Sequence, residues 1–142
     1  MVKKQIVNFV GKFLCKDRFK VQYVSNTICE GAPASVDTDH IIYINRAHFP
    51  TLPRVDQKCI LLHEIGHIIN KASSCCLSDS ELEAHETAIM LAWFTGMKKE
   101  EKHLDILIRS WNGYSWNEDH GMWRCHIKAS RKYIKKYGDK HE

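Results

Sequence analysis

Apolar positions near the start of the chain recur at helical spacing, with lysine and asparagine on the opposite side: Ile6, Val7, Phe9, Val10, Phe13 and Leu14. This pattern predicts an amphipathic first helix that packs on a core. From Phe19 onward apolar and polar residues alternate up to Val24, the period of a half-buried strand. The segment 31–35 breaks the alternation, and 40–45, rich in β-branched and aromatic residues, predicts a second strand. We expect a small sheet of two or three strands.

Beyond Asn45 the pattern is helical. Pro50 and Pro53 close a loop, and Thr51 is a candidate N-cap for a helix that runs to about Lys71. Further helices are predicted over about 78–94, 98–111 and 119–137. The order of a helix, a small sheet and then a helical majority predicts an α+β fold.

The composition fits a globular domain that spans residues 1–142, with 44% hydrophobic and 27% charged residues. The formal net charge is +4, and much of the excess lies near the C-terminus: Lys128, Arg131, Lys132, Lys135, Lys136 and Lys140. Such a run is typical of the solvated side of a terminal helix. No aromatic-rich platform for single strands accompanies it, so direct nucleic-acid binding is not expected.

The six cysteines include no Cys-x-x-Cys pair. No stretch approaches the roughly 20 apolar residues of a membrane span, and the N-terminus lacks a signal-peptide core. We therefore expect a cytoplasmic protein with reduced thiols and no membrane partner.

The chemistry-bearing pattern is His-Glu-x-x-His at residues 63–67. On a helix, His63 and His67 project from one face about one turn apart, where two imidazoles can bind one Zn²⁺. Glu64 would accept the proton of a water that zinc activates. This is the arrangement of zinc hydrolases.

The surroundings of this pattern favour a zinc site over a pair of core histidines. Apolar residues flank it on both sides, and ionisable groups on a buried helix are costly unless they are partnered. Gly66 in the middle of a helix costs roughly 1 kcal/mol against alanine. That cost is understandable if another backbone or a substrate comes close.

A catalytic zinc needs a third protein ligand. The next helix offers Glu81, whose face continues through His85, Ala88 and Ala92, small residues that allow close helix packing. Glu83 shares a second plausible inward face with Thr87, Met90 and Phe94, and either glutamate could instead close a capping box. The residues favour Glu81 as the ligand, with Glu83 and His85 as alternatives. His85 could also support a ligand or an oxyanion.

These residues resemble the ImmA/IrrE family of metallopeptidases, which carries a His-Glu-x-Gly-His helix followed by a Glu-x-Glu-Ala-Asn/Asp helix. The corresponding segments here are His-Glu-Ile-Gly-His at 63–67 and Glu-Leu-Glu-Ala-His at 81–85. The resemblance covers about residues 19–95 and leaves 96–142 as a helical extension. It implies a zincin-like domain, zinc on His63, His67 and Glu81, and Glu64 as the base.

The family also implies a protein substrate, since its members act on helix-turn-helix repressors in phages, integrative elements or damage responses. His85 stands where the family has Asn or Asp, and Thr87 where it has Phe. The helix-turn-helix domain often fused to such enzymes is not found here. The chain therefore resembles the mobile-element type, which acts on a separately encoded DNA-binding repressor.

Two further expectations concern substrate binding. Tyr114 or His120, near a turn rich in aromatic residues, could stabilise an oxyanion, although core and surface roles are the plainer interpretation. If the strand Ile41 to Ile44 were a free sheet edge, an extended peptide could pair with it over the zinc. A second metal site made of Cys75, Cys76, Cys125 and His126 is not favoured, because the spacing is not a recognised one.

Two other functions remain open. The chain could be a non-proteolytic zinc-containing protein that antagonises a transcription regulator by binding it. It could also be a DNA-associated protease of the SprT kind, which would need His85 or a later histidine as the third ligand. The Glu-x-Glu-Ala sequence favours the glutamate type.

Overall fold

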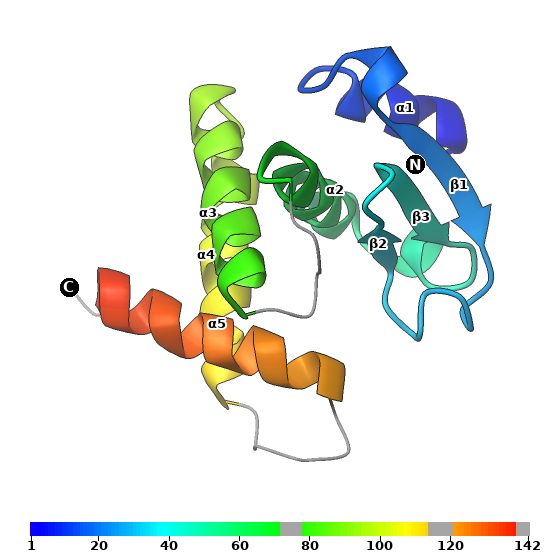
Figure 1. The fold of residues 1–142 in the computed structure, drawn as a ribbon. Coiled ribbons are helices and arrows are strands. Elements are labelled where there is room, and N and C mark those ends of the chain that lie inside the picture. Colours follow the sequence, from blue (N-terminus) through cyan, green and yellow to red (C-terminus); the bar gives the residue numbers. More distant parts are fainter. Residues whose placement is uncertain (72–77, 114–120, 139–142) are drawn as a thin grey trace.

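The computed structural model describes residues 1–71, 78–113 and 121–138. Its elements, in chain order, are α1 (Lys3–Val10), η1 (Lys16–Arg18), β1 (Lys20–Val24), β2 (Ala34–Val36), β3 (Ile41–Asn45), η2 (Phe49–Thr51), α2 (Arg54–Ile69), α3 (Ser78–Phe94), α4 (Lys98–Ser110), η3 (Trp111–Gly113) and α5 (Gly121–Tyr137). Within the described ranges the chain has five α-helices and one three-stranded sheet, which confirms the predicted α+β fold (Figure 1).

The sheet has the strand order β1-β3-β2, with β1 parallel and β2 antiparallel to β3. The condition set for peptide pairing with the strand Ile41 to Ile44 is therefore not met, because β3 is the central strand and both of its sides are paired. The sequence analysis did not locate strand β2, which begins directly after Pro33. It overlaps the segment 31–35, where glycine and proline interrupt the alternation typical of a strand.

On one side of β3 the outermost strand of the sheet is β2, and its outer edge pairs with no strand in the described part of the chain. Pro33 O accepts a hydrogen bond from Asn45 N (2.9 Å), and Asp37 N donates to Ile41 O (3.2 Å). In an antiparallel pair, alternate residues point their backbone groups toward the partner strand. The N–H and C=O groups of Ala34 and Val36 therefore point away from β3.

Asn45 ends the central strand as a fully buried polar residue whose amide is satisfied on both atoms. Its Nδ2 donates to Asn26 Oδ1 (2.8 Å) and Ala32 O (2.9 Å), and its Oδ1 accepts from the backbone N–H groups of Ala47 and His48. These bonds satisfy the amide inside the fold and turn the chain toward α2.

Thr51 does not cap α2, so the predicted N-cap is wrong. Thr51 lies in η2, where its hydroxyl donates to His48 O (2.6 Å), and α2 begins three residues later, after Pro53. Proline has no N–H and a fixed φ, so Pro53 suits the position that flanks the first helical turn.

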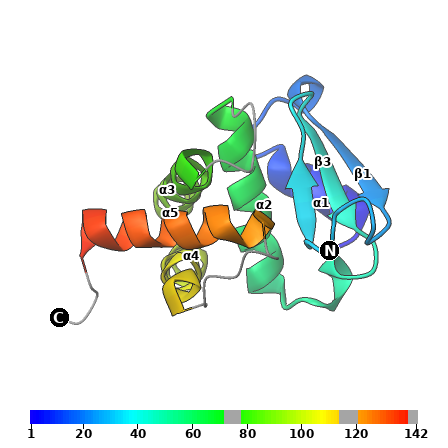
Figure 2. The same ribbon diagram turned by 60° about the horizontal axis from the view of Figure 1, so that its bottom comes forward.

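Helix α2 lies between the sheet and the helices α3, α4 and α5, while α1 packs beside the sheet. In Figures 1 and 2 the sheet lies on one side of α2 and α3 on the other. Ile65 and Ile68 of α2 join Ile42 and Ile44 of β3 in one buried cluster, which includes Leu104 of α4. The site helix is thus held by packing on several sides. In the described residues, no helix combines the length and apolar character that crossing a membrane requires.

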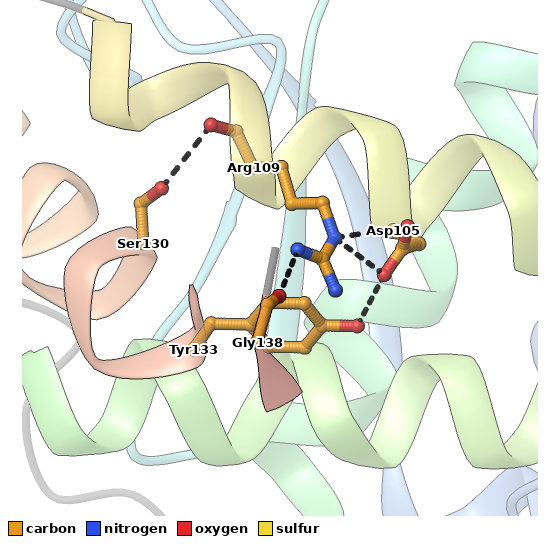
Figure 3. Close-up of polar contacts among 5 residues, drawn as sticks. All are labelled: Asp105, Arg109, Ser130, Tyr133 and Gly138. Carbon is orange, nitrogen blue, oxygen red and sulfur yellow. Dashed lines mark hydrogen bonds and ion pairs between the residues drawn. The ribbon is translucent and has the colours of Figure 1, made fainter. Parts of the chain in front are cut away.

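Helix α5 crosses α3 and α4 and contacts both of them (Figure 1). A polar network joins α5 to α4, as Figure 3 shows. Tyr133 OH donates to Asp105 Oδ1 (2.6 Å), Arg109 Nε contacts both Asp105 oxygens (3.1 Å each), and an Arg109 amino group donates to Gly138 O (2.6 Å).

The basic run is on the solvated side of α5, as predicted, since the described residues among its members are exposed. Two of them also pair with carboxylates of α3, where Lys132 Nζ lies 2.6 Å from Asp79 Oδ1 and Lys136 Nζ 2.7 Å from Glu86 Oε2. Part of the positive charge thus fixes α5 to α3.

Candidate metal centre

The two histidines of the motif lie on one face of α2, as the four-residue spacing predicts. Their ring centroids are 4.7 Å apart, and the Nε2 atoms of His63 and His67 are separated by 3.1 Å. The side chain of His67 is 3% exposed and that of His63 13%. Both imidazoles therefore direct the same nitrogen to one largely dehydrated point.

Glu81 reaches this point from the first turns of α3. Its Oε1 lies 2.7 Å from His67 Nε2, and its Oε2 lies 3.3 Å from His63 Nε2. Within the described residues, His63, His67 and Glu81 are the group of metal-ligating side chains whose donor atoms converge. The structure thus brings together the three residues that the sequence favours as ligands.

The second inward face considered for α3 is wrong. Glu83 is exposed, and so are Met90 (56%) and Phe94 (70%) on the same side of the helix. The buried face is the one that carries Glu81, His85 and the alanines Ala84, Ala88 and Ala92. Glu83 therefore points away from the candidate metal centre.

Gly66 explains how α3 comes close enough to deliver Glu81. A Cβ atom on Gly66 would lie 2.5 Å from the carbonyl oxygen of Ala84 and 3.0 Å from its Cα atom. The backbone of α3 occupies the space that a side chain would need. The expectation that another backbone approaches this glycine is thus confirmed.

The donor geometry fits a tetrahedral divalent ion. Two donors at about 2.1 Å from such an ion are separated by about 3.4 Å, and the observed separations of the ligand atoms named above are 2.7–3.3 Å. Two imidazoles and a carboxylate are a donor set that suits zinc. The residues present can therefore hold a metal ion without rearrangement of the helices.

The remaining nitrogen of each motif histidine, Nδ1, is buried and has no hydrogen-bond partner among the described residues. In many metal sites this nitrogen donates to a carboxylate or carbonyl, which fixes the ring. Here ring packing contributes instead, since the ring of His85 lies 4.2 Å from that of His63, centroid to centroid.

His85 is one helical turn beyond Glu81 and is 3% exposed. Burial, followed by the charge of His63, lowers the pKa of His85 well below its usual value, so this imidazole is neutral. It lies outside the group of converging ligand atoms. Its ring packs against the ring of His63 instead.

Glu81 is ionised although it is buried. Burial by itself would raise the pKa of Glu81, but the charge of His63 and the imidazole nitrogens of His126, His63 and His67, which lie 2.7–3.3 Å from its oxygens, hold that pKa far below its usual range. Burial likewise opposes the charged form of His67, yet its bond to Glu81 raises the pKa of His67. The carboxylate is thus in the form that binds a cation.

Glu64 lies beside this group as a 6% exposed carboxyl. Within the part of the chain that the structure describes, it has no hydrogen bond or ion pair. Burial raises the pKa of Glu64, and the charges of His67 and His63 act in the opposite direction. A carboxyl with a raised pKa and no partner is suited to accept a proton at neutral pH.

The structure adds a residue that the sequence reasoning did not assign to the site. His126 of α5 places its Nδ1 atom 2.9 Å from Glu81 Oε2, and its ring stacks on Trp111 at 4.7 Å with an angle of 20°. The sequence separation of 45 residues conceals this contact, because no spacing rule links α5 to α3. The sequence placed His126 only on the helix predicted over about 119–137 and in the less favoured second metal site.

Other predicted site residues lie elsewhere. Tyr114 and His120, the candidate oxyanion stabilisers, fall outside the described residues, as do Cys75 and Cys76 of the less favoured second metal site. Cys125 is buried. The second site therefore stays a prediction.

A scan against protein-family models found no match, and searches of curated proteins and of solved structures found no similar chain.

Proposed function

We propose that this chain is a zinc-dependent metallopeptidase. The observation that carries the proposal is the convergence of His63 Nε2, His67 Nε2 and the Glu81 carboxylate next to the carboxyl of Glu64, which has no hydrogen bond or ion pair within the described ranges. Binding a metal ion accounts for the burial of His67 and Glu81. Glu64 is also buried but is not one of the ligands. A role as general base beside the metal would explain why a carboxyl is buried there.

In this proposal each residue has one task. Zinc, when bound, supplies Lewis-acid activation of a water and a peptide carbonyl. Glu64 takes a proton from the attacking water and passes it to the nitrogen of the scissile bond, which then leaves as an amine. His63, His67 and Glu81 hold the ion, and the buried surroundings exclude bulk water from the proton transfer.

The substrate would bind as an extended peptide along β2. This strand packs against α2, and the outward backbone groups of Ala34 and Val36 can pair with one more strand. Because α2 also carries Glu64, a peptide paired with β2 would lie beside the helix of the base.

The substrate class rests on the resemblance of residues 63–67 and 81–88 to the ImmA/IrrE family. We propose a folded or partly unfolded cytoplasmic protein, with a helix-turn-helix repressor as the first candidate. The free thiols of Cys15, Cys29 and Cys59 support a reducing compartment.

The test compares the wild type with Glu64→Gln on a proteome-derived peptide library, with mass spectrometry of newly formed N-termini and zinc content measured on the same samples. The wild type should cut the library, and Glu64→Gln should retain zinc but lose cleavage by roughly 10²–10⁴-fold. Equal cleavage by the two proteins would refute the role of Glu64.

The rival function, a zinc-containing binding protein without peptidase activity, predicts a different outcome. Neither protein would cut, while both would bind the same repressor. A protease of the SprT kind is less well supported, because Glu81 occupies the position of the third ligand and His85 packs on His63 instead.

A further inference from the structure

Helix α5 contributes an imidazole to the candidate metal centre from outside the two helices that hold the ligands. We propose that His126 is a positioning residue: its Nδ1 atom lies 2.9 Å from Glu81 Oε2 and would donate a hydrogen bond to that oxygen when a metal ion binds the other one. The proposal rests on the metal site described above and assigns a function to the segment 96–142, which the motif does not cover.

The two oxygens of Glu81 have different surroundings. Oε1 faces His67 Nε2 at 2.7 Å, whereas Oε2 is shared between His63 Nε2 at 3.3 Å and His126 Nδ1 at 2.9 Å. A metal ion would take the two Nε2 atoms as ligands, so that they could no longer donate to the carboxylate. His126 would then be the donor that remains on Oε2.

A donor on one carboxylate oxygen fixes the carboxylate plane and favours binding through the other oxygen. Partners of this kind typically change metal affinity or activity by roughly 10–100-fold when they are removed. A glutamate that binds through one oxygen also leaves coordination space for a substrate. His126 would thus keep a coordination position open on the side of Glu81.

The position of His126 is fixed from two directions. Its ring stacks on Trp111, which follows α4, and its own helix is joined to α4 by the contacts of Tyr133, Asp105 and Arg109 (Figure 3). The ion pair of Lys132 with Asp79 ties the same helix to the start of α3, two residues before Glu81. This bracing holds the imidazole at a defined distance from the carboxylate.

The test is a competitive zinc titration of the intact chain and three variants. His126→Ala removes the donor, and His126→Asn retains an amide nitrogen near the position of Nδ1. His103→Ala is the matched control, because it removes an imidazole that contacts a different carboxylate, that of Asp56. We expect roughly 10–100-fold weaker zinc binding for His126→Ala, at least partial recovery for His126→Asn and no change for His103→Ala.

The visible spectrum of the Co²⁺-substituted proteins supplies a second readout that does not depend on activity. Loss of the donor should let Glu81 bind through both oxygens, which raises the coordination number and weakens the absorption of His126→Ala. His126→Asn should retain the intensity of the wild type. Circular dichroism of each metal-free variant checks that the helices are intact, and the Asn variant keeps the test valid if the Ala variant unfolds.

Two results would overturn the proposal while the metal site stands. One is an unchanged zinc affinity and cobalt spectrum in His126→Ala. The other is a spectrum of both His126 variants that reports a lost nitrogen ligand, which would make His126 a direct ligand. A wild type that binds no zinc would overturn the metal site itself, and this inference with it.

Discussion

Gly66 and Ala84 bring the two halves of the candidate metal centre together. The carbonyl oxygen of Ala84 would lie 2.5 Å from a Cβ atom on Gly66. Because the Ala84 atoms nearest to this Cβ belong to the backbone, a change of side-chain rotamer cannot relieve the clash. Gly66 lies between His63 and His67, and Ala84 follows Glu81 by three residues. The spacing of the helices at this contact therefore sets the distance between the ligands.

Gly66→Ala should push α3 away from α2. Although alanine favours a helix by about 1 kcal/mol over glycine, overpacking against a backbone costs about 1–3 kcal/mol or more. We expect a net loss of stability in urea unfolding and weaker zinc binding. The double variant Gly66→Ala/Ala84→Gly should not recover, since the clash is with the Ala84 backbone. Recovery in the double variant would show that position 66 needs glycine because of the Ala84 side chain and not because of the Ala84 backbone.

Val36→Pro tests the β2 edge as the peptide-binding strand. The Val36 N–H points away from β3, so proline removes a donor from the free edge and spares the existing ladder. Cleavage of peptides should fall mainly through a higher KM, with little change in the unfolding midpoint. Ser35→Pro, whose N–H faces β3, is the comparison and should destabilise the fold. An unchanged KM in Val36→Pro would exclude pairing at this position.

Tyr133→Phe should weaken the attachment of α5. The Tyr133 hydroxyl donates to the carboxylate of Asp105 at 2.6 Å in a buried setting, and bonds to charged groups contribute about 1.5–3 kcal/mol. Tyr137→Phe removes a similar bond to Glu86 from a side chain that is 50% exposed, so its effect should stay below about 1 kcal/mol. Urea unfolding of both variants measures the difference. Equal effects would argue against the Tyr133 network as the anchor of α5.

Cys59 should make the free energy of unfolding fall as the pH rises through the alkaline range. Burial, with the nearby charges of Glu100 and Asp56, raises the pKa of the Cys59 thiol to about 12. An unfolded thiol ionises near pH 8.5, so this contribution to stability is complete below that pH and is lost as the pH rises toward 12. The slope of the loss is about 1.4 kcal/mol per pH unit.

Unfolding midpoints between pH 8 and 11 measure this slope. The stability of Cys59→Ala should decline less steeply than that of the wild type, whereas Cys15→Ala, at an exposed position, should follow the wild type. Parallel curves for all three proteins would show that Cys59 titrates normally in the fold.

Local spacing predicted the part of the site that lies within single helices. His63, Glu64 and His67 are neighbours on α2, and the face of Glu81 was favoured because it continues through His85 and the alanines. Periodicity likewise predicted β1, β3 and the helices to within a few residues. Such features depend on residues close in sequence, where the geometry of a helix or strand fixes the relation.

The sequence did not predict features that depend on contacts between distant segments. The short strand β2 carries no alternation strong enough to overcome its glycine- and proline-rich surroundings, so the pattern did not show that β3 is the central strand. Thr51 has the chemistry of an N-cap, but Pro53 sets the start of the helix. His126 meets Glu81 only because α5 crosses α3, and no local pattern encodes a crossing.

The central claim is that His63, His67 and Glu81 hold one zinc ion, and zinc content after metal-replete purification tests it most directly. Wild type and Glu83→Ala should each contain about one zinc per chain, while His63→Ala and Glu81→Ala should contain almost none. Glu83 is the matched control because it is an exposed glutamate on the same turn of the same helix. Zinc retained in Glu81→Ala, or absent from the wild type, would contradict the account.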